Sequence, residues 1–125
     1  MPFSDLLNLK GDLYAQGAAG PVPTWSAVDG ADALPCRIQP LRGGTGTLGE
    51  EASATDKAWF EYTHKSKLRS GRALKVTQEK VDGSWLALED GDEYLLLSRP
   101  EDEAGAHHHL RVMLAYLAPG TVVTG

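Results

Sequence analysis

The chain has 125 residues, a formal net charge of −5, 42% hydrophobic residues and one cysteine. This length predicts a single domain over residues 1–125, and the hydrophobic content excludes a wholly disordered chain. The negative charge argues against a general attraction to nucleic acid or anionic membranes, and one cysteine cannot close an internal disulfide. The sequence shows neither an apolar run long enough to span a membrane nor a signal peptide, so we expect a cytosolic protein or part of an assembly formed there.

The first third of the chain predicts little regular structure before one strand. SDLLNLKG (residues 4–11) could form a short helix. A Gly-, Ala- and Pro-rich stretch follows, and we expect it to be extended or looped and anchored by Trp25. LPCRIQPL (residues 34–41) alternates weakly and predicts a strand. Pro35 and Pro40 place it at a sheet edge or confine its pairing to the middle, because proline donates no ladder hydrogen bond.

The rest of the chain reads as short strands separated by turns. AWFEYTHK (residues 58–65) alternates well enough to predict a strand. Asp82-Gly83 lies between two strand-like runs and favours a type I′ hairpin turn, in which both central residues have positive φ. EYLLLS (residues 93–98) predicts a further strand. In HHHLRVMLAYL (residues 107–117) the alternation favours a strand over a helix, with one wall of Leu, Val and Tyr buried.

These elements predict a mainly β fold. We expect a small β-barrel or sandwich of about six strands, with a long loop after the first core strand and at most a short N-terminal helix.

Charge is distributed unevenly along the sequence. A basic run without acids extends over residues 65–75, and an acidic run with one arginine extends over residues 89–103. They could be two solvated edges. Alternatively, the basic surface of one copy meets the acidic surface of the next in a head-to-tail contact, which generates a ring if the rotation closes. The candidate interface residues are Lys65, Lys67, Arg69, Arg72, Asp92, Glu93, Glu101 and Asp102.

The motifs that carry chemistry elsewhere are weak in this chain. Residues 44–49 match the G-x-G-x-x-G spelling of a dinucleotide loop, but the next expected element is a strand, whereas that site needs a helix. The histidines at 107–109 could bind zinc, although a polar strand start is the simpler interpretation. Cys36 suits a small buried hydrophobe. We find no catalytic signature, and we expect no enzymatic activity and no cofactor.

The aromatic residues leave two interpretations open. Trp25, Trp59 and Trp85 could be stacking platforms of an OB-like module that binds nucleic acid. They are scattered along the chain, which favours roles as core or interface anchors. A small OB-like module that binds nucleic acid or protein is nevertheless the second functional hypothesis, and a metal enzyme that uses the histidines is the third.

Taken in order, the chain resembles the head–tail joining proteins of tailed bacteriophages, the head-completion or stopper proteins of the virion neck. The resemblance extends from about Leu13 to Leu117. It rests on a Trp-containing turn (TWSAVDG), the strand LPCRIQPL, the long loop RGGTGTLGEEASATDK, the strand AWFEYT, the stretch LRSGRALKV, the strand GDEYLLLS, an acidic loop and the closing strand HHLRVMLAYL. One departure is the hairpin VDGSWLALEDG, which is longer than the family pattern needs.

The resemblance implies a structural protein of the virion neck, assembled in the bacterial host cytoplasm. It implies a β-barrel protomer in a homo-oligomeric ring of on the order of six or twelve copies. The ring would join a portal or adaptor protein on the head side to a tail terminator or tail tube protein on the tail side, with packaged DNA in its channel and no membrane partner.

The resemblance also gives the loop at residues 43–57 a role, as a projection that closes the channel. The alternative is a surface loop without a role. The channel-loop candidates are Gly43, Gly44, Thr45, Gly46, Thr47, Leu48, Gly49, Glu50 and Glu51.

Overall fold

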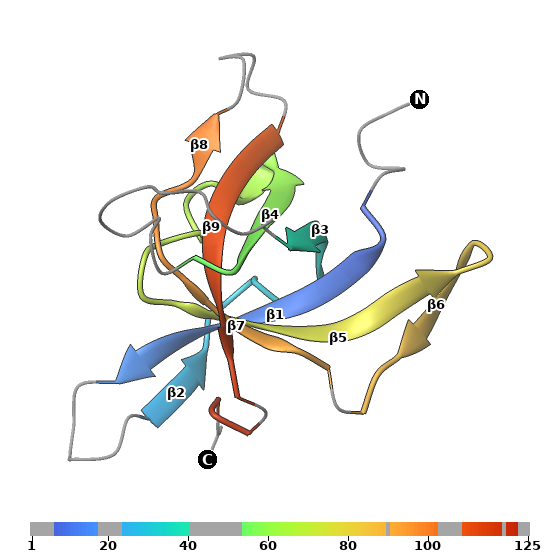
Figure 1. Ribbon diagram of the computed structural model, residues 1–125, viewed down its shortest axis with the longest axis horizontal. Helices are drawn as coiled ribbons and strands as arrows, with labels where there is room; N and C mark the ends of the chain where they lie inside the picture. Colours follow the sequence, from blue (N-terminus) through green and yellow to red (C-terminus); the bar gives the residue numbers. More distant parts are fainter. Residues whose placement is uncertain are drawn as a thin grey trace.

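A computed structural model describes residues 7–17, 24–40, 54–89, 91–102, 109–118 and 120–122 (Figure 1). Most of these residues form strands. The one helical element in the described part of the chain is a 3₁₀ turn between the fourth and fifth strands. In chain order the elements are β1 (Leu9–Gly17), β2 (Thr24–Ala27), β3 (Leu34–Pro40), β4 (Asp56–Glu61), η3 (Tyr62–His64), β5 (Ala73–Val81), β6 (Ser84–Ala87), β7 (Glu93–Leu96), β8 (Glu101–Asp102) and β9 (His109–Leu117).

Six of the strands close into an antiparallel barrel. The strands pair in the order β1-β3-β4-β9-β7-β5, and β5 pairs with β1 to complete the circle. The other three lie outside this circle: β2 pairs with β1, β6 with β5 and β8 with β9. The prediction of a small, mainly β barrel is therefore confirmed, with three short strands added to the six that close it.

The barrel interior is filled by side chains that alternate inward along the strands. Phe60, Leu74, Leu96, Leu110 and Leu114 are each 0% exposed and belong to one cluster. Burying each such side chain contributes about 1.5–3 kcal/mol, so this cluster dominates the stability of the fold.

A second, smaller cluster holds the C-terminal part of the described chain. It contains Trp25, Ala73 and Val122. Trp25 is 8% exposed, which confirms the expectation that it anchors its segment.

Three predictions about local structure were wrong in whole or in part. The strand predicted over residues 58–65 is Asp56–Glu61, and Tyr62–His64 form the 3₁₀ turn η3. Leu9–Gly17 is strand β1, so the described part of residues 4–11 is not helical.

Leu34–Pro40 is the third strand, and it pairs with β1 on one side and β4 on the other. It is not an edge strand, and its pairing is not confined to the middle, because Pro35 pairs with Lys10 and Pro40 with Asp56. Local residue patterns missed these features because they depend on pairing with distant segments.

Predictions based on local turn chemistry did better. Asp82 and Gly83 both have positive φ, 51° and 80°, as a type I′ turn requires. Strand β9 buries Leu110, Val112 and Leu114, but Tyr116 in the same alternation is 46% exposed, near the end of the strand. The buried wall predicted for this strand is therefore confirmed except at its end.

Gly91 lies where the chain returns from the β5–β6 hairpin to the barrel. A Cβ atom on Gly91 would lie 1.7 Å from the carbonyl oxygen of Val76, a distance that no side chain tolerates. The amide of Val76 donates to the carbonyl of Asp92 over 2.9 Å, so the two backbones are in close contact. Only glycine fits between them, and the position of β7 after the hairpin depends on it.

Candidate functional site

The connection between β3 and β4 is longer than its ends require. Pro40 pairs directly with Asp56, so the chain leaves and re-enters the sheet at neighbouring positions. A hairpin between such positions needs only about two to five residues. All the channel-loop candidates, Gly43 to Glu51, lie outside the described residues, as does the G-x-G-x-x-G match.

The base of this connection is fixed to β9. The Thr55 amide donates to the carbonyl of Leu114 over 2.8 Å. The Thr55 hydroxyl accepts a hydrogen bond from the Tyr116 amide and donates one to Asp56, each over 2.7 Å. The barrel thus has a defined rim at the point where the long connection begins and ends.

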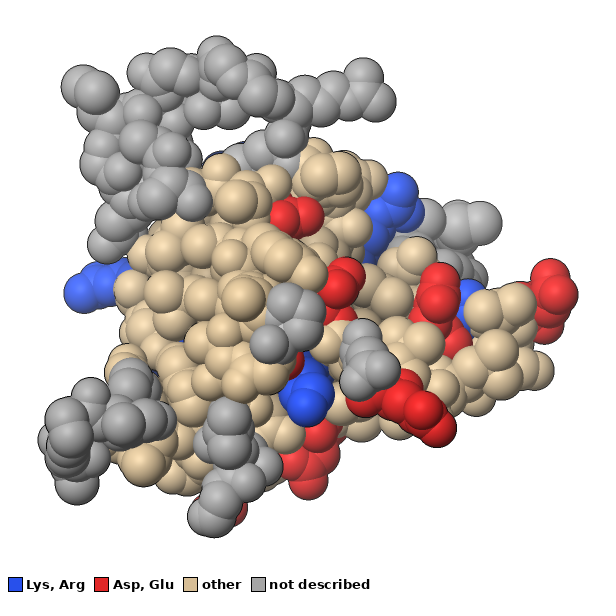
Figure 2. Space-filling model, turned by 60° about the horizontal axis from the view of Figure 1, so that its bottom comes forward, with Lys and Arg blue, Asp and Glu red and all other residues tan. Residues whose placement is uncertain are grey.

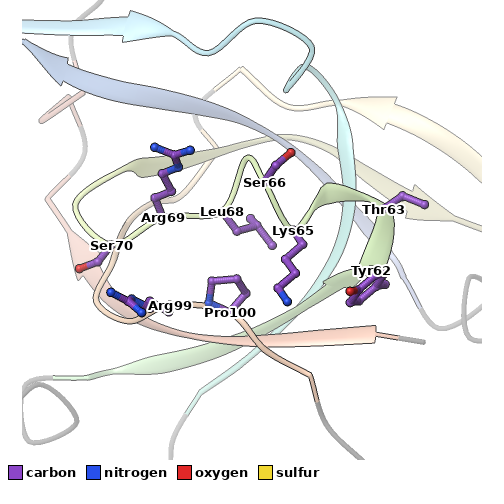
Figure 3. A pocket seen from close by; sticks show the side chains of 9 residues that line it. All are labelled: Tyr62, Thr63, Lys65, Ser66, Leu68, Arg69, Ser70, Arg99 and Pro100. Atoms are coloured by element: carbon purple, nitrogen blue, oxygen red, sulfur yellow. The ribbon is translucent and has the colours of Figure 1, made fainter. Parts of the chain in front are cut away.

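A cleft of about 940 Å³ lies between the segment that joins β4 to β5 and the segment after β7 (Figure 3). Leu68 and Pro100 lie near its centre in Figure 3, with Arg99 toward one end and Tyr62 toward the other. The cleft combines an apolar floor with polar walls. Its lining residues are Tyr62, Thr63, Lys65, Ser66, Leu68, Arg69, Ser70, Arg99 and Pro100.

One wall of the cleft is held by hydrogen bonds to backbone carbonyls of β7 and of the segment after it. The Gly71 amide donates to the carbonyl of Leu96 over 2.8 Å, and the Ser70 hydroxyl donates to the carbonyl of Leu97 over 3.2 Å. Leu68, 1% exposed, belongs to the barrel core and fixes the floor. Gly71 has φ of 90°, which glycine adopts without strain, and this residue turns the chain into β5.

The cleft is positively charged. Lys65, Arg69 and Arg99 are exposed around it, and the lining contains no acid. The Lys65 ammonium lies 5.5 Å from the centre of the Tyr62 ring, a cation–π contact. None of the three cations forms an ion pair with another described residue. The cleft is therefore suited to an anionic partner that also carries apolar groups.

The structure separates the basic interface candidates into two groups. Lys65 and Arg69 are exposed at the cleft, as a contact surface requires. Arg72 is half-buried and its guanidinium donates to the carbonyl of Lys67, while the Lys67 side chain lies near Gly30. The basic run is therefore not one continuous surface. Arg99, the third cation of the cleft, was missed because it lies within the acidic run of the sequence.

Glu93 was predicted to lie at a subunit interface, but the structure buries it. It is 3% exposed, and its two carboxylate oxygens accept hydrogen bonds from the amides of Gly120 and Val122 over 2.8 and 2.6 Å. Both oxygens of this buried carboxylate accept hydrogen bonds within the same chain, so the side chain is not available for contact with a neighbouring copy. The sequence does not distinguish it from Asp92 beside it, which is exposed.

The other acidic candidates are also divided. Glu101 forms an ion pair with Arg111 over 2.7 Å, on the surface of the same chain. The backbone of Asp102 pairs with Leu110 in β8 and β9. Asp92 is one of the acids near Tyr94, whose pKa is raised mainly by burial and further by these acids. The acidic run is thus not a single surface patch.

Acidic side chains instead gather around the β5–β6 hairpin. Glu79, Asp82 and Glu89 are exposed on it or directly beside it. Figure 2 shows acidic side chains concentrated on the right of the molecule, the side on which Figure 1 places this hairpin. Glu79 and Asp82 lie outside the acidic run of the sequence and were therefore not among the predicted interface residues. The one signal for this hairpin was that it is longer than the family pattern needs.

The described residues offer no group of three or more His, Cys, Asp or Glu side chains that could hold a metal ion. His107 and His108 lie outside the described residues, and His109 begins β9. The Nδ1 atom of His64 is buried without a hydrogen-bond partner, and burial lowers the pKa of this ring, with a further decrease from Lys67.

Cys36 is 0% exposed within the core, as predicted for a small buried hydrophobe. Burial raises the pKa of its thiol to about 12.

The comparisons with known proteins give no family for this chain: no family model and no curated protein matches it. Among the described residues, no helix has the length and apolar character to cross a membrane.

Proposed function

We propose that the protein is a structural component of a bacteriophage neck, which joins the DNA-filled head to the tail as a homo-oligomeric ring. The proposal includes no catalytic activity and no cofactor. Its partners would be a portal or adaptor protein on the head side, a tail terminator or tail tube protein on the tail side, and the packaged DNA in the channel.

The observation that carries the proposal is the excess length between β3 and β4. Because Pro40 and Asp56 are direct partners in the sheet, the fold does not need a connection of this length. Long connections between adjacent elements of a rigid scaffold are frequent sites of function. In the proposed ring, the part of the predicted loop 43–57 that precedes β4 would extend toward the channel in each copy and close it; Asp56 and Lys57 themselves belong to β4.

The separation of charge supports assembly into a ring. The basic cleft and the acidic β5–β6 hairpin lie on different sides of the barrel: in Figure 1 the segment between η3 and β5 is on the left and the hairpin on the right. Two complementary surfaces placed apart on one chain produce head-to-tail contacts, which close into a ring when the rotation permits.

The second candidate function is a small module that binds nucleic acid. The observation that favours it is the position of Tyr62 beside Lys65 in the basic cleft, since stacked bases and phosphates use this combination. The distribution of the tryptophans opposes it. They lie on three different strands, β2, β4 and β6, and Trp25 is buried in the small core cluster.

The test replaces residues 43–54 with a short Gly-Ser turn. The isolated domain should remain folded, because shortening a loop changes its closure entropy by less than about 1 kcal/mol per halving of length. Phage particles that carry the shortened protein should lose packaged DNA or fail to join tails. The measurements are thermal unfolding of the domain, infectivity of the particles and DNA retained per head.

A matched control keeps the length of the segment and replaces its residues with Gly and Ser. Loss of infectivity in both variants would assign the role to residue identity, and loss in the shortened variant alone would assign it to length. The proposal is wrong if particles with the shortened segment are fully infectious. Specific binding of short single-stranded DNA by the isolated domain, abolished by Lys65→Glu, would support the nucleic-acid module in its place.

A further inference from the structure

The tip of the β5–β6 hairpin exposes an apolar face. Val81 and Leu86 are 41% and 51% exposed. Glu79 pairs with Leu86 and Val81 pairs with Ser84, so all four side chains lie on one face of the hairpin. This face therefore presents two aliphatic side chains next to a carboxylate, in an exposed position.

An irregularity in the pairing of β1 with β5 changes the course of β5 before the hairpin. Val76 pairs with Gly11, but the next pair along the strands is Gln78 with Lys10, which leaves Thr77 as an extra residue in β5. Such a bulge bends the strand and increases its twist. At this end of β5, the Lys80 amide donates a hydrogen bond to the carbonyl of Asn8 over 2.9 Å. Beyond it the hairpin projects from the barrel (Figure 1).

On the opposite face of the same hairpin, two cations lie over the Trp85 ring. The ammonium group of Lys10 lies 4.3 Å from the centre of the Trp85 ring, and that of Lys80 lies 5.9 Å from it. These cations give that face a positive charge, which the basic cleft would repel. A partner would therefore meet the face of Val81 and Leu86, with Glu79 and Asp82 beside it.

The cleft on the other side of the barrel has the complementary properties. Leu68 and Pro100 give it an apolar floor, and Lys65, Arg69 and Arg99 surround it. Its volume of about 940 Å³ is within the range of pockets that hold a bound group. Contacts that bury apolar groups at the centre and pair charges at the rim are typical of specific interfaces.

We propose that the β5–β6 hairpin of one copy of the chain inserts into the basic cleft of the next copy, with Val81 and Leu86 against the accessible part of the apolar floor at Pro100, and with Glu79 and Asp82 facing the cleft cations. The occupant of the cleft is thus a second copy of this chain. The inference rests on the proposed ring and specifies the contact that closes it.

Cysteine cross-linking tests the contact directly. Leu86→Cys places a thiol on the hairpin face and Ser66→Cys places one at the cleft, while native Cys36 is buried and does not react. Oxidation of the double variant should give a ladder of disulfide-linked oligomers on a non-reducing SDS gel. A mixture of the two single variants should give mainly heterodimers. Ala87→Cys, an exposed position on the other face of the hairpin, is the matched control and should not link to Ser66→Cys.

Self-association measured without cross-linking gives a second test. Leu86→Ser should weaken self-association about ten-fold or more by mass photometry, because an aliphatic contact is lost. Tyr116→Ser, at a site of similar exposure (46%), should leave it unchanged. The cross-linked ladder should weaken between about 0.05 M and 0.5 M NaCl, since salt screens the rim charges.

The outcomes separate this inference from the proposed function. Rings without the Leu86–Ser66 cross-link would overturn the hairpin contact and leave the ring proposal standing. A chain that is monomeric at every salt concentration would overturn the contact, and the neck function would then depend on the particle experiment alone. Equal cross-linking from Ala87→Cys would also overturn it, because a docked hairpin presents only one face to the cleft.

Discussion

The buried carboxylate of Glu93 should hold the C-terminal segment against the barrel, and its removal should release that segment. Its Oε2 accepts from the Gly120 amide and its Oε1 from the Val122 amide. Val122 in turn packs with Trp25 in the small core cluster. Glu93→Gln retains the size of the side chain but replaces one acceptor oxygen with an amide NH₂ group, a donor that would face a backbone N–H.

The magnitude follows from the two hydrogen bonds. Each bond to a charged group contributes about 1.5–3 kcal/mol. Gly120 is exposed, so water can replace its bond, but Val122 is 5% exposed and its amide would remain without a partner. We therefore expect Glu93→Gln to lower the free energy of unfolding by roughly 2–4 kcal/mol, which corresponds to a decrease in Tm on the order of 10 °C for a domain of this size.

Urea unfolding followed by tryptophan fluorescence measures this loss. A red shift in the native emission of the variant, before the main transition, would indicate that Trp25 has lost its contact with Val122. Glu101→Gln is the control, because Glu101 forms only a surface ion pair with Arg111, and it should cost no more than about 1 kcal/mol.

A truncation after Leu117 separates the hydrogen bonds from other effects of the substitution. In the shortened chain the two amides are absent, so Glu93→Gln should have a much smaller effect than in the full chain. The reasoning would be refuted if Glu93→Gln changed the unfolding free energy of the full chain by less than about 0.5 kcal/mol, or if the truncation left its effect unchanged.

Two further predictions concern packing. Gly91→Ala should destabilise the domain by about 1–3 kcal/mol in urea, because its Cβ would collide with the carbonyl of Val76, whereas the exposed Ser84→Ala should be nearly neutral; equal effects would contradict the close approach. The Cys36 thiol, with its pKa raised to about 12 by burial, should react with a thiol reagent at mildly alkaline pH only after unfolding, and native labelling as fast as in denaturant would show that it is accessible.

Features that depend on neighbouring residues could be predicted from the sequence. Alternation of apolar and polar residues indicated strands, because a strand places successive side chains on opposite faces. The Asp82-Gly83 turn was predicted because both residues tolerate positive φ, and the structure has both. Cys36 and the core wall of β9 followed in the same way from local hydrophobic pattern.

The sequence indicated only some of the residues that form the basic cleft. Lys65 and Arg69 were predicted as interface residues and lie at the cleft. Arg99 joins them because the segment after β7 packs beside the segment after β4, a contact between residues about thirty positions apart. Glu79 and Asp82 were missed for a similar reason: their exposure depends on how far the hairpin projects beyond the barrel.

The sequence by itself determined the class of fold, the tight turn, the burial of Cys36 and most of the buried wall of β9. Only the tertiary structure decided that β1 closes the barrel against β5, that Glu93 is buried while Asp92 is exposed, and where the charged surfaces lie. The physical reason is that strand propensity and turn chemistry act between residues close in the chain. Burial, backbone approach and surface charge are instead set by pairing between strands that are distant in the chain.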